Sequence, residues 1–169
     1  KEAINNSDIV INLIGILFEN RKQKFSNIHS DLPGLIAKYC SESEVKKFIH
    51  VSAIGANAES NSLYQQSKFS GEQEALANFK NTVIIRPSVV CGVEDNFTNL
   101  FAKLSLSPVI PVVKPNYKFQ PILVDDVATA IVKAIEIKKN EGKIYEIGGP
   151  TIISFKDMVK SILSTIRKK

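Results

Sequence analysis

Three short apolar runs, each separated from the next by a stretch with helical spacing, constrain the fold of this chain most strongly. They read IVINLIGIL at 9–17, KKFIHVSA at 46–53 and NTVIIRPS at 81–88. Near-continuous apolar runs are typical of strands buried on both faces, as in a parallel sheet covered by helices. Helical spacing at 26–43 and 62–79 completes βαβ units. The sequence therefore predicts an α/β fold with a doubly wound parallel sheet.

Beyond Ser88 the strand and helix patterns are less regular, but strand-like and helix-like stretches still alternate. PILVDDVATAIVKAIEI at 121–137 predicts a short strand followed by an amphipathic helix, with Asp125 placed to cap that helix. KIYEIGGPTIISFKDMVKSIL at 143–163 predicts a strand, a tight turn and a helix capped near Ser154. We accordingly divide the chain into a sheet-forming region, 1–92, and a mixed region, 93–169.

Cysteine content and hydropathy exclude several protein classes. Cys40 and Cys91 are too few for a disulfide framework, and with His29 and His50 they do not form a zinc-like spacing, so we expect no metal site. No apolar run approaches the roughly 18–20 residues of a membrane-spanning helix. We expect a protein of a reducing compartment with no transmembrane segment.

The net charge of +5 lies entirely in the C-terminal stretch 133–169, which carries nine basic and four acidic side chains. Its aromatic residues, Tyr145 and Phe155, are not interleaved with the lysines as a base-stacking platform requires. We therefore expect no nucleic-acid binding. A solvated lysine-rich face explains the charge best, and an acidic partner or an anionic surface is the alternative.

Tyr64 and Lys68 stand four residues apart in a stretch with helical spacing, LYQQSKFSGE. Positions i and i+4 share one helix face, so both side chains can reach one pocket. A nearby ammonium stabilises a phenolate and lowers the pKa of a tyrosine toward the range useful in acid–base catalysis. The same ammonium can hydrogen-bond a ribose hydroxyl.

The order of these motifs resembles the extended or atypical branch of the short-chain dehydrogenase/reductases, which are NAD-dependent epimerase/dehydratase-like proteins with a Rossmann-like fold. The matching phrases are VINLIG, KFIHVSA, the Tyr64–Lys68 pair, RPSVVCGVEDNF, KFQPILVDDVA and YEIGGP. They are most similar to the subgroup formed by the nucleotide-binding accessory subunit of respiratory complex I and its bacterial relatives. That resemblance implies tightly bound NADP(H) or NAD(H), held mainly as a structural element.

The resemblance also implies roles for particular residues. The segment 12–15 and Ser52 would lie along the dinucleotide, Tyr64 and Lys68 would meet the nicotinamide ribose, and Pro87 with Ser88 would flank the nicotinamide ring. The implied catalytic set is Ser52, Tyr64 and Lys68. The residues of the segment 12–15 are Asn12, Leu13, Ile14 and Gly15.

Two departures from the family pattern bear on function. The position where relatives carry a second hydroxyl beside the tyrosine falls on Ala53, which weakens stabilisation of a substrate carbonyl and favours binding over turnover. The glycine-rich phosphate loop is also missing, so the chain corresponds to the C-terminal portion of the fold without its first βαβαβα half. Residues 1–92 then form the C-terminal half of an NAD(P)-binding domain, and 93–169 form a small substrate-side lobe with closing elements.

Without the first half, the strand at 9–17 becomes an open sheet edge that invites pairing. The expected partners are therefore the dinucleotide and either complex I subunits or a chain that supplies the missing half. The expected location is cytoplasmic, or peripheral at the inner face of a respiratory membrane. Two other functions stay open: an active NAD(P)-dependent epimerase, dehydratase or reductase, and a non-binding scaffold module or truncated remnant.

Overall fold

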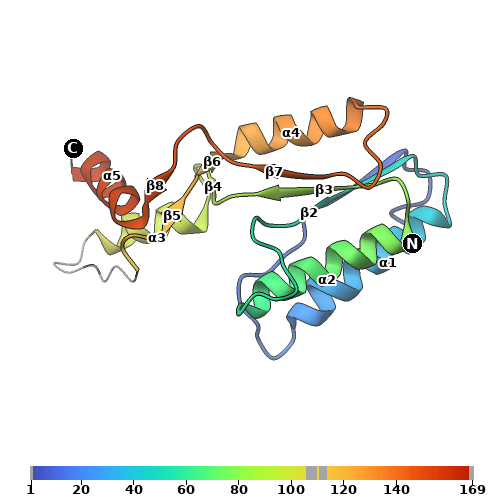
Figure 1. Ribbon diagram of the computed structural model, residues 1–169, viewed down its shortest axis with the longest axis horizontal. Helices are drawn as coiled ribbons and strands as arrows, with labels where there is room; N and C mark the ends of the chain where they lie inside the picture. The colour runs from blue at the N-terminus through green and yellow to red at the C-terminus, as the bar shows by residue number, and fades with distance from the viewer. Residues whose placement is uncertain (1, 106–109, 111–113, 168–169) are drawn as a thin grey trace. The chain divides into compact units, whose positions relative to one another are not determined.

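The computed structural model describes residues 2–105, 110 and 114–167 (Figure 1). They form two compact units, one made of Lys1–Pro87 and Thr129–Ile147 and the other of Ser88–Ala128 and Gly148–Lys169. The division after residue 92 stays a prediction. In chain order the elements are β1 (Ile9–Asn12), η1 (Ser26–Asp31), α1 (Leu32–Ser41), β2 (Lys47–Val51), α2 (Leu63–Asn78), β3 (Thr82–Pro87), β4 (Val90–Cys91), α3 (Asn96–Leu104), β5 (Lys118–Phe119), β6 (Ile122–Leu123), α4 (Val124–Glu136), β7 (Ile144–Ile147), β8 (Ile153–Ser154) and α5 (Phe155–Arg167).

A four-stranded parallel sheet in the order β1-β2-β3-β7 forms the centre of the first unit. The three apolar runs of the sequence supply β1, β2 and β3, and Ile49 and Ile84 in the middle of the sheet have no exposed surface. β1 pairs only with β2 among the described strands, and its Ile11 is 42% exposed. The parallel α/β fold is thus confirmed, with β1 at an edge of the sheet.

Helices cover both faces of this sheet. Figure 1 shows α1 and α2 side by side on one face and the part of α4 that belongs to this unit on the other. Phe48 on β2 packs with Ala37 and Cys40 of α1 and Ala75 of α2 in a buried apolar cluster. This cluster fixes α2 against the sheet and so fixes the position of everything that α2 carries.

Lys47 anchors the C-terminal end of α4 to the opposite face of β2. Its Nζ donates hydrogen bonds of 2.6–2.9 Å to three carbonyl oxygens, those of Ala134, Ile135 and Ile137. Unpaired carbonyls and the negative end of the helix dipole favour a cation there. Lys47 is 9% exposed, and the three carbonyl dipoles stabilise its buried charge.

A buried ion pair joins α2 to the sheet. Arg86 of β3 donates two parallel hydrogen bonds to the Glu72 carboxylate, from Nε to Oε1 at 2.9 Å and from Nη2 to Oε2 at 2.7 Å. Its third nitrogen, Nη1, lies 3.1 Å from Oε1 of Glu146 on the neighbouring strand β7. Glu72 is fully buried, whereas the Glu146 side chain is 53% exposed.

The second unit has short strand pairs and an aromatic cluster. β4 pairs parallel with β6, and β5 pairs antiparallel with β8. The Ser154 hydroxyl accepts a hydrogen bond from the Asp157 amide at 3.1 Å, which confirms the predicted cap of α5. The rings of this cluster lie 5.2–6.2 Å apart, and they belong to Phe97, Phe101, Phe119 and Phe155.

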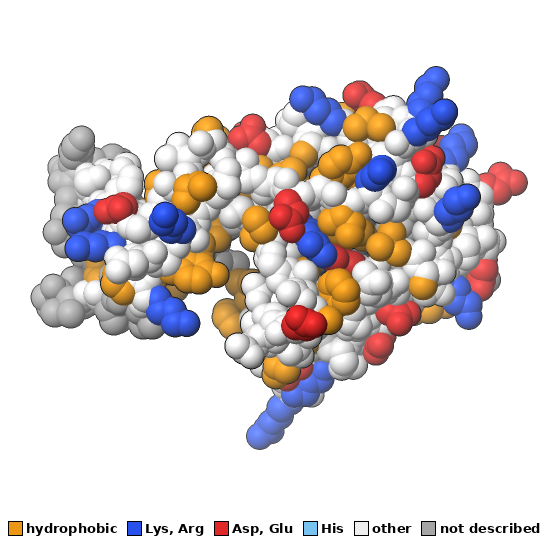
Figure 2. Space-filling view, in the orientation of Figure 1, with side chains coloured by type: hydrophobic (Ala, Val, Ile, Leu, Met, Phe, Trp, Pro, Cys, Tyr) orange, Lys and Arg blue, Asp and Glu red, His pale blue; other side chains and the backbone are white. Residues whose placement is uncertain are grey.

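Basic and acidic side chains are interspersed with hydrophobic ones on the face shown in Figure 2. The excess of positive charge therefore does not gather into a single patch on this face. In the described part of the chain, no helix is long and apolar enough to cross a membrane.

Candidate functional site

Helix α2 brings Tyr64 and Lys68 to the end of the central strands. They lie one turn apart on the helix, and the Lys68 side chain is 3% exposed. Lys68 Nζ donates a hydrogen bond of 2.9 Å to the carbonyl oxygen of Val51, the last residue of β2. The ammonium is therefore held at the carboxyl edge of the parallel sheet, where ligands of doubly wound sheets bind.

Burial dominates the electrostatics of the pair. It lowers the pKa of Lys68 to about 8, against the opposing effect of the Glu72 carboxylate one turn further along α2. It also raises the pKa of Tyr64 above its ordinary value. From the sequence we expected the pKa of Tyr64 to be lowered, because the Lys68 ammonium could face the phenol. In the structure, that ammonium instead donates to the Val51 carbonyl oxygen.

The residue after β2, Ser52, has a buried hydroxyl without a partner among the described residues. Its backbone N–H donates to the Ile85 carbonyl at 2.7 Å, which continues the sheet ladder past the end of β2. Phe48, His50 and Ser52 alternate along the strand, so they point to the same face, toward α1 and α2. Lys68 and Ser52 thus come from neighbouring positions at one end of the sheet.

Asn12 shapes the loop that leaves β1. Its side chain is buried, its Nδ2 lies 3.1 Å from His50 Nδ1, and its Oδ1 accepts the Ile14 N–H at 3.0 Å. His50 is fully buried, as expected, but its Nε2 has no partner among the described residues. Burial, followed by the positive charge of Lys68 and the neighbouring His29, lowers the pKa of His50 to about 3, so the ring is neutral.

The other predicted cofactor-binding residues occupy distinct environments. Leu13 and Ile14 are 66% and 52% exposed, and Gly15 is exposed beside them. Pro87 ends β3, is buried, and accepts a hydrogen bond of 3.0 Å from the Ile54 N–H. Ser88 is buried and begins the second unit.

The structure adds His29, for which the sequence indicated no function. His29 lies in the π-helical turn η1 and is 1% exposed. Its Nε2 accepts the Ile16 N–H at 3.0 Å, and its Nδ1 lies 2.9 Å from Ser67 Oγ on α2. These partners are 13 and 38 residues away in the sequence, so no local pattern could have revealed them.

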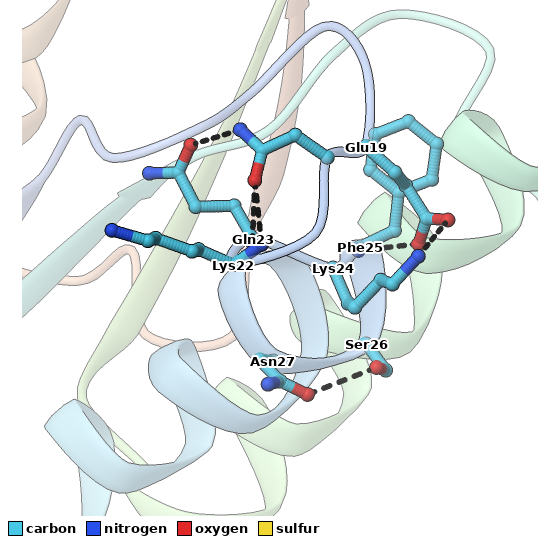
Figure 3. A network of polar contacts seen from close by, with 8 residues as sticks. Glu19, Lys22, Gln23, Lys24, Phe25, Ser26 and Asn27 are labelled. Carbon is cyan, nitrogen blue, oxygen red and sulfur yellow. Dashed lines mark hydrogen bonds and ion pairs between the residues drawn. The ribbon is translucent and has the colours of Figure 1, made fainter.

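The segment between the β1 loop and η1 is ordered by its own side chains (Figure 3). Asn20 Oδ1 accepts the N–H groups of Lys22 and Gln23, each at 2.8 Å. Glu19 accepts the Phe25 N–H at 2.9 Å. This turn places the Phe25 ring in stacking contact with His29, with centroids 5.1 Å apart.

Comparison with known proteins gives one family match and a set of similar chains. Residues 55–169 match the family described as the RmlD substrate binding domain. The chain is 37% identical over 164 residues to mitochondrial NADH dehydrogenase (ubiquinone) 1 alpha subcomplex subunit 9 of Mus musculus, covering 96% of this chain and 44% of that protein. The protein of the same name from Dictyostelium discoideum is 32% identical, with 96% and 46% covered. The chain thus spans less than half the length of these relatives.

Solved structures show the same fold at low sequence identity. UDP-glucuronic acid 4-epimerase from Bacillus cereus, in complex with NAD, superposes with a TM-score of 0.84 at 24% identity, covering 99% of this chain and 62% of that one. The dTDP-4-dehydrorhamnose reductase from Bacillus anthracis, in complex with NADP, has a TM-score of 0.77 at 18% identity, with 95% and 62% covered.

Proposed function

The chain belongs to the RmlD substrate binding domain family, within the extended branch of the short-chain dehydrogenase/reductases, and on that premise we propose that it forms the part of an NAD(P)-binding site that receives the nicotinamide ribose. One observation carries this proposal. The buried ammonium of Lys68 lies at the carboxyl edge of the sheet, one helical turn from Tyr64 and beside Ser52.

The residues present fit such a group. The Ser52 hydroxyl is buried and has no partner among the described residues, which is the expected condition of a group that a ligand completes. Lys68 has three N–H donors, and Val51 accepts one of them. Lys68 and Tyr64 would hold the ribose hydroxyls, Ser52 and the segment 12–15 would lie along the dinucleotide, and Pro87 with Ser88 would flank the nicotinamide ring.

We further propose that the cofactor is held mainly as a structural element. When bound, a nicotinamide dinucleotide supplies hydride-transfer chemistry. Burial keeps the pKa of Tyr64 above its ordinary value, so the phenol stays protonated and is a poor base at neutral pH. Ala53 offers no second hydroxyl to orient a substrate carbonyl.

The alternative is an active NAD(P)-dependent epimerase, dehydratase or reductase, which the presence of both Tyr64 and Lys68 favours. Turnover that stops in Tyr64→Phe while nucleotide binding persists would support this alternative. An unchanged cofactor after long incubation with carbonyl and hydroxyl substrates supports the structural role.

Nucleotide binding tests the proposal directly. NADPH and NADH are titrated by fluorescence into the chain alone and into the chain joined at its N-terminus to a glycine-loop half. We expect binding in the joined form, and Lys68→Met to weaken it by about tenfold to a hundredfold, because a charge-assisted hydrogen bond is lost. Exposed Lys38 on α1, changed to Met, is the matched control. No binding in either form would leave the scaffold or remnant interpretation.

The affinity for NADPH should also depend on pH. It should fall as the pH rises through about 8, because Lys68 loses its proton there in the free protein.

The names of the relatives suggest the protein partner. The mouse and Dictyostelium proteins are named as subunits of mitochondrial NADH dehydrogenase. We therefore propose that this chain binds subunits of a respiratory NADH dehydrogenase and lies peripherally at the inner face of the membrane. The chain is expected to migrate with that complex in a native gel, and consistent separation from it would contradict this assignment. A chain that supplies a glycine-loop half is the other proposed partner, which would pair with β1 at the sheet edge.

A further inference from the structure

His29 is bonded to two separate segments of the first unit, and these bonds fix its tautomer. The Ile16 N–H can only donate, so Nε2 of the neutral ring accepts and Nδ1 carries the hydrogen. Nδ1 then donates to Ser67 Oγ, and the Ser67 hydroxyl donates to the Tyr64 carbonyl at 2.8 Å. One chain of hydrogen bonds therefore runs from the loop after β1 to the first turn of α2.

The His29 ring also contacts the Tyr64 side chain itself. The two rings meet edge to face, with centroids 5.3 Å apart and an angle of 89° between their planes. Phe25 stacks on His29 and meets Tyr64 edge to face at 5.9 Å, so the three rings form one cluster. Aromatic pairs of this geometry favour a single ring orientation.

The backbone around His29 lies directly against α2. A Cβ atom at Gly71 would overlap the His29 carbonyl oxygen, so η1 and α2 are in direct backbone contact there. Ser30 Oγ donates to the Ser67 carbonyl at 3.3 Å, which adds a second link. Single π-helical turns are frequent at functional sites, and this one presents its buried histidine to the tyrosine helix.

We propose that His29 is a positioning residue of the nucleotide site, which holds the Tyr64 phenol and the loop 13–16 in one fixed arrangement before the cofactor arrives. The inference rests on the proposed function of that site. Burial, together with the Lys68 charge, lowers the pKa of His29 to about 4, so the ring stays neutral and keeps one donor and one acceptor. His29 is buried behind the tyrosine and acts through it.

Three variants separate the two hydrogen bonds. In His29→Gln the side-chain amide can reach the Nε2 position and accept from Ile16, in His29→Asn it can reach the Nδ1 position and donate to Ser67, and His29→Leu makes neither bond. Ile84→Val, a buried change on β3 in the apolar cluster around Phe48, is the control for a general loss of stability. The readouts are the NMR shifts of the Tyr64 ring protons, assigned with Tyr64→Phe, the exchange rate of the Ile16 amide, and NADPH affinity of the joined form.

We expect His29→Leu to shift the Tyr64 ring signals, to speed Ile16 exchange by about tenfold or more, and to weaken NADPH binding by about tenfold. His29→Gln should restore slow exchange of the Ile16 amide. His29→Asn should restore the Tyr64 ring signals more fully than His29→Gln does. Unchanged Tyr64 signals and Ile16 exchange in a folded His29→Leu would overturn the proposal, as would changes equal to those of Ile84→Val. If the His29→Leu protein does not fold, the opposite effects of His29→Gln and His29→Asn still test the proposal. Changed Tyr64 signals in a protein that binds no NADPH would count against the proposed function alone.

Discussion

Replacing Arg86 with methionine is expected to lower the free energy of unfolding by about 3–5 kcal/mol. Arg86 donates two hydrogen bonds to the Glu72 carboxylate, which is fully buried. Without the guanidinium, the buried Glu72 carboxylate loses both of these hydrogen bonds and its ion-pair partner. Urea denaturation of the wild type and the variant measures the difference.

Two matched variants show whether the buried charge is the cause. Glu146→Gln removes only the half-exposed partner of Arg86 and should cost less than about 1 kcal/mol. The double variant Arg86→Met with Glu72→Leu removes both charges and should recover most of the loss. If Arg86→Met costs no more than Glu146→Gln, or if the double variant is as unstable as the single one, the ion pair is not what stabilises this junction.

Alanine at Gly71 is the second change with a large expected effect. The added Cβ would overlap the carbonyl oxygen of His29, and a backbone atom cannot rotate away as a side chain can. We expect a loss of about 3 kcal/mol, although alanine gains about 1 kcal/mol of helix propensity over glycine. The clash also separates η1 from α2, so NADPH affinity of the joined form should fall with stability.

Ser70→Ala is the matched control, since Ser70 is the exposed neighbour of Gly71 on the same helix. It should change the free energy of unfolding by no more than about 0.5 kcal/mol. A Gly71→Ala protein as stable as Ser70→Ala would mean that η1 and α2 are not held in the close contact described here.

The parts of the fold that could be predicted are those with a strong local pattern. The runs around Ile11, Ile49 and Ile84 were long and apolar enough to identify three parallel strands. The pairs β4–β6 and β5–β8 were not predicted, because strands of two residues carry no periodicity. The helical spacing at 26–43 did not distinguish η1 from α1, and the structure places Pro33 in the first turn of α1, where a missing N–H costs nothing.

The candidate site divides in the same way. Tyr64 and Lys68 could be paired from the sequence because a spacing of four residues on a helix determines their common face. The pKa direction of Tyr64 could not be predicted, because it depends on burial and on where the Lys68 ammonium donates. His29 acts through contacts between segments that only the folded chain brings together.

Lys47, described above at the end of α4, has a chemical consequence. All three hydrogens of its ammonium can be donated to the three carbonyl oxygens, so no lone pair is exposed for attack on an acylating reagent. Acetylation of this residue requires the last turn of α4 to leave the sheet first. The rate at which an amine reagent labels Lys47 therefore reports how often the end of α4 opens locally. Exposed lysines such as Lys138 and Lys139 need no such opening to react.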